Sequence, residues 1–274
     1  MSGQLGDLRR VLSGLGPVVV AFSGGADSAF LAKVAHDTLG PPRVLCATAV
    51  SASLAPDEQA DCAALAAEWG LDWVSVPTAE LEDPEYVANG PDRCARCKTA
   101  LLGALGPLAA ARSATVVLGV NVDDLGDHRP GQAAAAALGA AFPLVSAGFT
   151  KADVRRWSRR LGLRTWDKPA AACLASRVPY GTPVTLGTLG SVARAEAALR
   201  ALGFGQLRVR HHGDVARIEV PTEDLGRVVE RRVPVLEAVR AAGYAYVAVD
   251  LEGFVSGSMN RVLAAPAGAR RADR

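Results

Sequence analysis

Residues 18–28 read Val-Val-Val-Ala-Phe-Ser-Gly-Gly-Ala-Asp-Ser, and no other stretch of the chain says as much about its fold. The apolar run at the start is typical of a buried strand, and residues 29–39 carry a helical pattern. A strand that passes through a glycine turn into a helix is how α/β proteins build a phosphate cradle. The glycines let backbone N–H groups approach a phosphate, and the serines add hydroxyl donors. The alternative is a glycine turn that only caps a helix.

Apolar β-branched stretches alternate with helical patterns through the first half of the chain. We expect strands at residues 18–22, 44–49, 73–76 and 115–119. We expect helices at residues 29–39, 57–69, 98–111 and 151–161. This alternation predicts an α/β fold with a parallel sheet and helices on both faces. Ligands of such sheets bind beyond the carboxyl ends of the strands, where the glycine turn lies.

A different pattern follows Pro179-Tyr180-Gly181. We expect a helix at residues 186–202, hairpin strands at 207–210 and 215–220, a helix at 225–241 and a strand at 244–251. This order predicts a second, smaller α+β domain of the split βαβ type. We therefore divide the chain into residues 1–180, residues 181–265 and a tail, 266–274, that we expect to be disordered.

Composition limits the class of protein. Among 274 residues, 30 are Lys or Arg and 28 are Asp or Glu, which leaves a net charge of only +2. Dedicated nucleic-acid binders usually carry a larger basic excess. No apolar run approaches the roughly 20 residues of a membrane span, and the first residues lack a signal-peptide pattern. Five cysteines, an odd number, argue against a complete disulfide framework and favour a cytoplasmic protein with reduced thiols.

Three of the cysteines stand in informative surroundings. Cys94 and Cys97 form a C-x-x-C, which fits half a zinc site, a redox pair or part of an iron–sulfur cluster. A zinc site would need further Cys or His at matching spacing, and a redox pair usually sits at a strand-to-helix turn. Cys173 precedes Arg177, a setting that favours the thiolate. A small buried core residue is an equally good interpretation of Cys173.

Taken together, these segments resemble the LarE family of PP-loop enzymes, the ATP-dependent pyridinium-3,5-biscarboxylic acid mononucleotide sulfurtransferases. That family makes the thiocarboxylate ligand of the nickel-pincer nucleotide cofactor. The resemblance covers roughly residues 5–262 and rests on residues 23–28, 89–94, 121–131, 148–151, 168–181, 207–210, 253–254 and 256–260. It implies that the first domain is a PP-loop domain, similar to the adenine nucleotide alpha hydrolases.

The resemblance implies that ATP first adenylylates a substrate carboxylate. The residues it assigns to ATP are Ser23, Gly24, Gly25, Asp27, Ser28, Asn121, Asp124, Asp127 and Arg129. Asp27 would also hold Mg²⁺, because hard cations prefer carboxylate oxygens. Residues 121–129 are rich in charge, so a solvated loop is the alternative there.

The resemblance also implies that sulfur reaches the activated carboxylate through Cys173. In one route the cysteine itself is sacrificed, which leaves dehydroalanine. In the other, three cysteines hold a [4Fe-4S] cluster whose open iron carries an extra sulfide. Cys94, Cys97 and Cys173 match the three-cysteine pattern, and thiolates suit such clusters, so we favour the cluster route.

The anionic substrate is assigned by resemblance to four residues, Ser176, Arg177, Arg208 and Arg210. An exposed strand face is the alternative for the last two. Glu196 matches an acidic position of the family at which metal binding is conceivable. The chain departs from some relatives at Arg227, where an acid can occur, and at Val255, where an arginine can occur. Relatives assemble as hexamers, which implies a homo-oligomer.

Two other functions fit parts of the pattern. A PP-loop tRNA thiolase would use the same loop, and residues 155–160, Arg-Arg-Trp-Ser-Arg-Arg, resemble a nucleic-acid patch. These residues also fit the solvated face of an amphipathic helix. A non-catalytic nucleotide-binding module would need no activated thiol. We therefore expect a small-molecule nucleotide substrate, no nucleic acid and no membrane.

Overall fold

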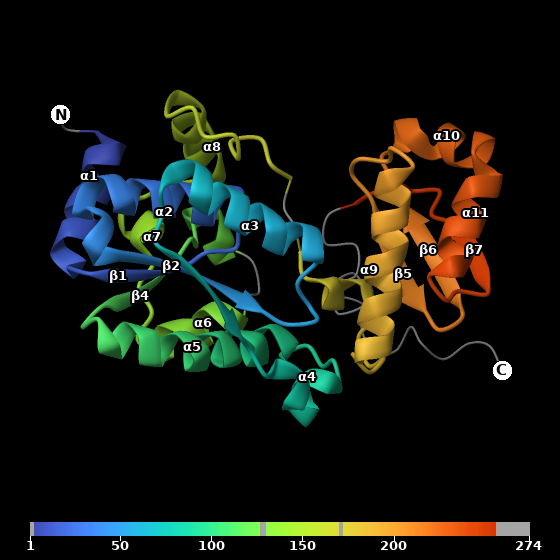
Figure 1. The fold of residues 1–274 in the computed structure, drawn as a ribbon, viewed down its shortest axis with the longest axis horizontal. Coiled ribbons are helices and arrows are strands. Elements are labelled where there is room, and N and C mark those ends of the chain that lie inside the picture. Colours follow the sequence, from blue (N-terminus) through green and yellow to red (C-terminus); the bar gives the residue numbers. More distant parts are fainter. Residues whose placement is uncertain (1–2, 127–129, 170–171, 256–274) are drawn as a thin grey trace. The chain divides into compact units, whose positions relative to one another are not determined.

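The computed structural model describes residues 3–126, 130–169 and 172–255. It divides into two compact units (Figure 1). The first unit comprises Met1–Tyr86 and Asp92–Ala172, and the second comprises Val87–Pro91 and Cys173–Arg274. The short segment joins the second unit because Asn89 is fully buried there and its Nδ2 donates to Pro179 O at 2.8 Å and Thr182 O at 2.9 Å.

A four-stranded parallel sheet forms the middle of the first unit, in the order β3-β2-β1-β4. Its strands are β1 (Val18–Ala21), β2 (Val44–Val50), β3 (Trp73–Pro77) and β4 (Thr115–Leu118). The predicted parallel sheet is therefore confirmed. The chain moves to one side of β1 for β2 and to the other side for β4, and a crevice forms at such a reversal. The predicted glycine turn directly follows β1.

Helices cover both faces of this sheet (Figure 1). One face carries α1 (Gln4–Leu15), α2 (Ala26–Leu39), α3 (Pro56–Trp69), α7 (Pro143–Ser146) and α8 (Lys151–Arg160). The other face carries α5 (Arg93–Ala111) and α6 (Pro130–Ala137). Successive strand residues point to opposite faces, so Val18 and Val20 of β1 join the first core and Val19 joins the second. The sequence pattern did not predict α1, α6 or α7.

The second unit places helices α9 and α11 against a three-stranded sheet. Its elements are α9 (Leu186–Ala201), β5 (Arg208–His212), β6 (Val215–Glu219), α10 (Leu225–Glu230), α11 (Arg232–Ala241) and β7 (Tyr246–Val249). The smaller α+β domain and its hairpin are confirmed, because β5 and β6 pair antiparallel and His212 lies opposite Val215. The core gathers Leu199 of α9, Val239 of α11 and Ile218 of β6.

Two details predicted for the second unit are wrong. The two parallel strands, β6 and β7, are direct neighbours, so the βαβ connection is not split. Residues 225–241 form two helices rather than one, with a break at Arg231. Pro234 explains the break, because it has no N–H for the carbonyl of Glu230 and its ring would clash there. Among the described residues, no helix combines the length and the apolar character needed to cross a membrane.

Candidate active site

The glycine loop, which we define as residues 23–28 after β1, is held in shape by serine hydroxyls. Ser28 Oγ lies 3.0 Å from Ser23 Oγ, accepts from Ser23 N at 3.2 Å and donates to Gly25 O at 3.2 Å. Gly25 is the N-cap of α2, and no side chain in the described structure caps that helix end. The first N–H groups of α2 therefore lack a side-chain acceptor, which is the arrangement that binds phosphate.

Two glycines make the close packing of this loop possible. Gly24 has φ +67°, and a Cβ there would lie 2.9 Å from Cys62 Sγ. A Cβ on Gly119, just after β4, would lie 2.8 Å from Ser28 N and 2.9 Å from the carbonyl carbon of Asp27. Backbone atoms cannot yield easily, so only glycine lets the end of β4 rest on the first turn of α2. The sequence pattern predicts a strand that includes Gly119 but indicates no role for this glycine.

Asn121 brings the loop after β4 to the glycine loop. Its side chain is fully buried, and Nδ2 donates to Asp27 Oδ1 at 3.2 Å. Asp124, in the first turn of the 3-10 helix Val122–Gly126, accepts from Asn121 N at 3.2 Å through Oδ2. The structure thus brings together Asp27, Asn121 and Asp124, three of the residues predicted for ATP. Asp127 and Arg129 lie outside the described residues.

Among the described residues, no Lys or Arg forms an ion pair with Asp27. Burial raises the pKa of this half-buried carboxyl, and Asp124 raises it further, while Asn121, Lys151 and Arg155 act in the opposite direction. The nearest cation contact in the cluster belongs to Asp124, whose Oδ1 lies 3.1 Å from Lys151 Nζ. A carboxylate of this kind fits the predicted magnesium site, because a divalent cation would stabilise its ionised form.

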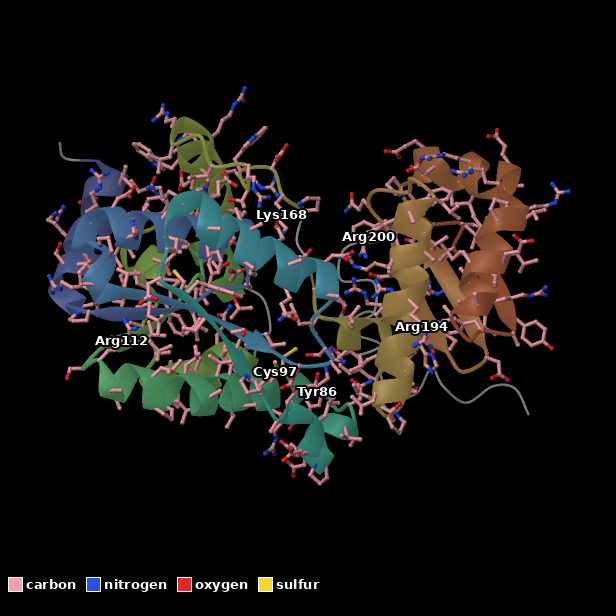
Figure 2. All side chains as sticks on the ribbon, in the orientation of Figure 1. Tyr86, Cys97, Arg112, Lys168, Arg194 and Arg200 are labelled. Atoms are coloured by element: carbon pink, nitrogen blue, oxygen red, sulfur yellow. The ribbon has the colours of Figure 1, made fainter. Side chains whose placement is uncertain are left out.

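Lys168 supports the glycine loop from outside it. Its Nζ donates to Gly24 O at 3.2 Å and to the carboxylates of Glu58 and Asp61 on α3 at 2.7 Å (Figure 2). Burial lowers the pKa of Lys168, but the two carboxylates outweigh it and the net direction is upward. Lys168 lies in a segment that resembles the LarE family, but no role could be predicted for it because its acidic partners lie more than 100 residues away in sequence.

A second polar group at the carboxyl edge of the sheet was also missed. Glu80, which follows β3, is 4% exposed. Its Oε1 accepts from Ser51 Oγ and from Ser53 Oγ, both of which follow β2. Among the described residues, Oε2 has no hydrogen-bond partner. The only sequence signal was the pair of serines directly after a buried strand.

Cys94 and Cys97 lie in the first turns of α5, which begins at Arg93, so the expected helix start at residue 98 is wrong (Figure 2). Cysteines three apart on a helix share one face. Cys94 is exposed, Cys97 is partly buried and neither forms a disulfide, so their thiols suit iron. Within the described residues, no three His, Cys, Asp or Glu side chains form a metal site. The three-cysteine site stays a prediction, because Cys173 belongs to the second unit.

The remaining two cysteines are structural. Cys46 and Cys62 are fully buried in the first unit. Burial raises the pKa of Cys46 to about 12 and also raises the pKa of Cys62. Both therefore stay protonated at neutral pH and act as small core side chains.

Cys173 begins a tight turn that we name the Cys173 turn, residues 173–177. The cysteine is exposed and the 3-10 turn Leu174–Arg177 follows it. Cys173 O accepts from Ser176 N at 2.9 Å and from Arg177 Nη1 at 3.0 Å. The same Nη1 lies 3.0 Å from Ser176 Oγ. Arg177 therefore fixes the backbone of the cysteine that precedes it.

Glu196 of α9 is the partner of Arg177. Its carboxylate accepts from Arg177 Nε at 2.8 Å and from Nη2 at 3.0 Å, and both side chains are buried. It also accepts from Arg200 Nη2 at 3.1 Å and from Val209 N at 3.1 Å. Burial alone would raise the pKa of Glu196, but Arg177 and these other donors hold it below its usual value. The metal role considered for Glu196 finds no support here, since arginines surround the carboxylate.

The two arginines of β5 differ from each other. Arg210 is buried, and its Nη2 donates to Glu219 Oε2 at 2.7 Å. Arg208 is half-buried, and its guanidinium stacks on the Phe254 ring at 5.0 Å. Burial and the nearby Arg177 lower the pKa of Arg208 to about 10. Arg177 and Arg210 place further positive charge near Arg208, so an anion would be stabilised beside Arg208.

Arg227 and Val255 are the two positions at which the sequence departs from some relatives. Arg227 Nη1 donates to Gly203 O at 3.2 Å and its guanidinium covers the Phe204 ring at 4.7 Å, which is a packing role. Val255 ends the described part of this unit. The matching residues 256–260 and the predicted tail, 266–274, lie outside the described residues.

The parallel sheet, the glycine loop after β1 and the helices on both faces define an α/β protein with a PP-loop-like domain. Comparison with known proteins then specifies the family. No family model matches the chain. Over 258 residues it is 39% identical to the pyridinium-3,5-bisthiocarboxylic acid mononucleotide synthase of Lactiplantibacillus plantarum, with 93% of both chains covered. The chain belongs to the LarE family, and thereby to a family of enzymes.

Two further relatives extend the comparison. The chain is 44% identical over 266 residues to the uncharacterised protein slr1717 of Synechocystis sp., with 96% of this chain and 99% of the relative covered. It is 23% identical over 243 residues to the uncharacterised protein MJ0830 of Methanocaldococcus jannaschii, with 86% and 89% covered. These likenesses span both units of the structure.

Proposed function

We propose that the protein is an ATP-dependent sulfurtransferase that converts a carboxylate of pyridinium-3,5-biscarboxylic acid mononucleotide into a thiocarboxylate for the nickel-pincer nucleotide cofactor. The observation that carries the proposal is the 39% identity, over 93% of both chains, to a synthase named for the bisthiocarboxylic product. The glycine loop, and the Cys173 turn with the arginines that surround it, supply groups that such a reaction needs.

The first step activates the carboxylate. A carboxylate oxygen attacks the α-phosphorus of ATP, the bond to the bridging oxygen of the β-phosphate breaks, and pyrophosphate leaves with its electron pair. The N–H groups of Gly24, Gly25 and the first turn of α2 would bind the phosphates. Asp27, positioned by Asn121, would hold a magnesium ion, which when bound would offset the charge of the departing pyrophosphate.

The second step replaces AMP by sulfur. The half-buried Arg208 would receive the anionic end of the substrate, because its guanidinium is already oriented on Phe254. Cys94, Cys97 and Cys173 would hold a [4Fe-4S] cluster, which when bound would supply sulfide from the iron that no cysteine ligates. The alternative source is Cys173 itself, which would be left as dehydroalanine.

Anaerobically reconstituted protein incubated with MgATP, sulfide and the pyridinium dicarboxylate tests the proposal by mass spectrometry of the product. We expect a thiocarboxylate that depends on ATP and disappears in Cys173→Ala. Thiolation of tRNA in place of the pyridinium substrate would overturn the substrate assignment.

The sulfur source is tested on the same samples. The cluster route predicts bound iron, visible absorption, no mass change at Cys173 after turnover and loss of activity in Cys94→Ser. Loss of the mass of H₂S at Cys173, with Cys94→Ser still competent, would establish the sacrificial route instead.

A further inference from the structure

The arginines predicted to receive the substrate do not have the same surroundings. Arg177 is 3% exposed and Arg210 is 4% exposed, while Arg208 is half-buried. A residue that binds a ligand from solution must present its hydrogen-bond donors to that solution. Arg208 Nη1 also donates to a backbone carbonyl, Leu207 O at 2.8 Å, but Arg177 and Arg210 are buried and direct donors at both carbonyls and carboxylates.

Each of these two arginines directs one donor at a backbone carbonyl of the Cys173 turn. Arg177 Nη1 donates to Cys173 O at 3.0 Å, and Arg210 Nη1 donates to Ser176 O at 2.9 Å. The first carbonyl lies at the start of the turn and the second near its end. Two guanidiniums from separate segments thus hold the backbone on either side of Leu174 and Ala175, which are themselves buried.

Each of these arginines is in turn oriented by a buried carboxylate. Glu196 is 0% exposed and binds Arg177 through both oxygens at 2.8 and 3.0 Å. Glu219 is 0% exposed and binds Arg210 at 2.7 Å. A two-point arginine–carboxylate pair fixes the plane of the guanidinium as well as its position. Glu196 also accepts from Val209 N, between the two arginines of β5, and so joins α9, β5 and the Cys173 turn.

We propose that Glu196–Arg177 and Glu219–Arg210 form a clamp that positions Cys173, and that these arginines are positioning residues rather than ligands of the substrate phosphate. Arg208 is the arginine that meets the phosphate. The proposal deepens the proposed function, on which it rests for the role of Cys173. Its consequence is that loss of the clamp weakens sulfur transfer without weakening substrate binding.

The kinetic test compares Arg177→Lys with Arg208→Gln in the full-length enzyme. Lysine keeps the charge of Arg177 but cannot reproduce its planar fork. Thiolation is measured with pyridinium-3,5-biscarboxylic acid mononucleotide and with the same compound lacking its phosphate. Arg177→Lys should lower kcat by about tenfold or more with both compounds and leave KM within about threefold, because a misplaced reacting group costs rate.

The matched variants should behave differently. Arg208→Gln should raise KM for the nucleotide by about tenfold or more and should have little effect with the compound that lacks phosphate. Arg194→Lys is the neutral control, because Arg194 lies on α9 with Arg200 (Figure 2) but, among the residues that the structure describes, bonds to Ser191 Oγ and Ala242 O and not to the Cys173 turn. A loss in Arg177→Lys that appears only with the phosphorylated compound would overturn the clamp.

A readout without substrate separates this proposal from the proposed function. Hydrogen exchange at the amides of Ser176 and Val178, which bond within the turn, should be faster in Arg177→Lys and unchanged in Arg208→Gln. If neither compound is thiolated, the proposed function fails, and the hydrogen-exchange result alone then tests the clamp. Unchanged exchange in Arg177→Lys would overturn it.

Discussion

The glycine loop of the first unit and the Cys173 turn of the second unit are built in opposite ways. The glycine loop uses backbone N–H groups and small hydroxyls, and its one carboxylate, Asp27, has a raised pKa because burial is not offset by enough positive charge. Around the Cys173 turn, the buried carboxylates Glu196 and Glu219 pair with the guanidiniums of Arg177 and Arg210, and the pKa of Glu196 is lowered. We propose that a cation and phosphates complete the first arrangement, whereas in the second the buried charges already compensate one another.

The largest loss of folding stability is expected for Glu196→Gln, beside the Cys173 turn. Removing one partner of a buried pair costs about 3–5 kcal/mol, because Arg177 is left uncompensated. Urea unfolding measures the loss. Glu237→Gln, on the exposed side of α11, should stay within about 0.5 kcal/mol of the parent.

The pH dependence of this loss has a definite sign. Since the folded pKa of Glu196 is lowered, its stabilisation is present above the ordinary value of 4.5 and is lost as pH falls through the folded pKa. The stability difference between the parent and Glu196→Gln should therefore shrink in acid. A difference that stays constant or grows would contradict the pairing.

A smaller effect is expected for Gly119→Ala in the first unit. The new Cβ would meet backbone atoms of Asp27 and Ser28 at 2.8–2.9 Å, so α2 must shift. Overpacking of this kind costs about 1–3 kcal/mol, and the distorted loop should bind ATP more weakly. Calorimetric titration with MgATP and thermal unfolding measure the two effects.

Gly103→Ala is the matched control for Gly119→Ala. A Cβ on Gly103, an exposed position in α5, meets nothing within 4 Å. Alanine there should stabilise the protein by about 0.5–1 kcal/mol and leave ATP binding unchanged. Equal behaviour of the two variants would show that the contact between β4 and α2 does not shape the loop.

The smallest change in stability, with the opposite sign, is expected for Asp27→Asn. The folded pKa of Asp27 is raised, so its ionisation opposes folding increasingly as pH rises from the ordinary value of 3.8 through the folded pKa. The variant should be more stable than the parent at pH 7 and should gain less in acid. Its ATP-dependent pyrophosphate release should be lost. A less stable variant at pH 7 would mean that Asp27 is already compensated.

The difference between the two regions also explains which features could be predicted from the sequence. The strands and the glycine loop were predictable because their signals are local: apolar runs, two glycines and a helical pattern in adjacent residues. The pair Arg177–Glu196 spans 19 positions, and a lone glutamate in a helix is typical of an exposed surface. Neither charge pattern nor spacing marks it as buried.

Other differences have simpler causes. The break at Arg231 was visible in Pro234, which the helical pattern outweighed. The start of α5 at Arg93 was missed because Asp92 and the preceding turn residues resemble a loop. Val87–Pro91 joins the second unit through Asn89, and no local signal reports a partner about 90 residues away.

We propose a division of labour in which the glycine loop activates the carboxylate and the clamped Cys173 turn acts only afterwards. Exchange of labelled pyrophosphate into ATP, driven by the pyridinium dicarboxylate, measures the first step alone. Cys173→Ala should retain this exchange near the parent rate while forming no thiocarboxylate, and Asp27→Asn should lose both. Loss of the exchange in Cys173→Ala would contradict the account.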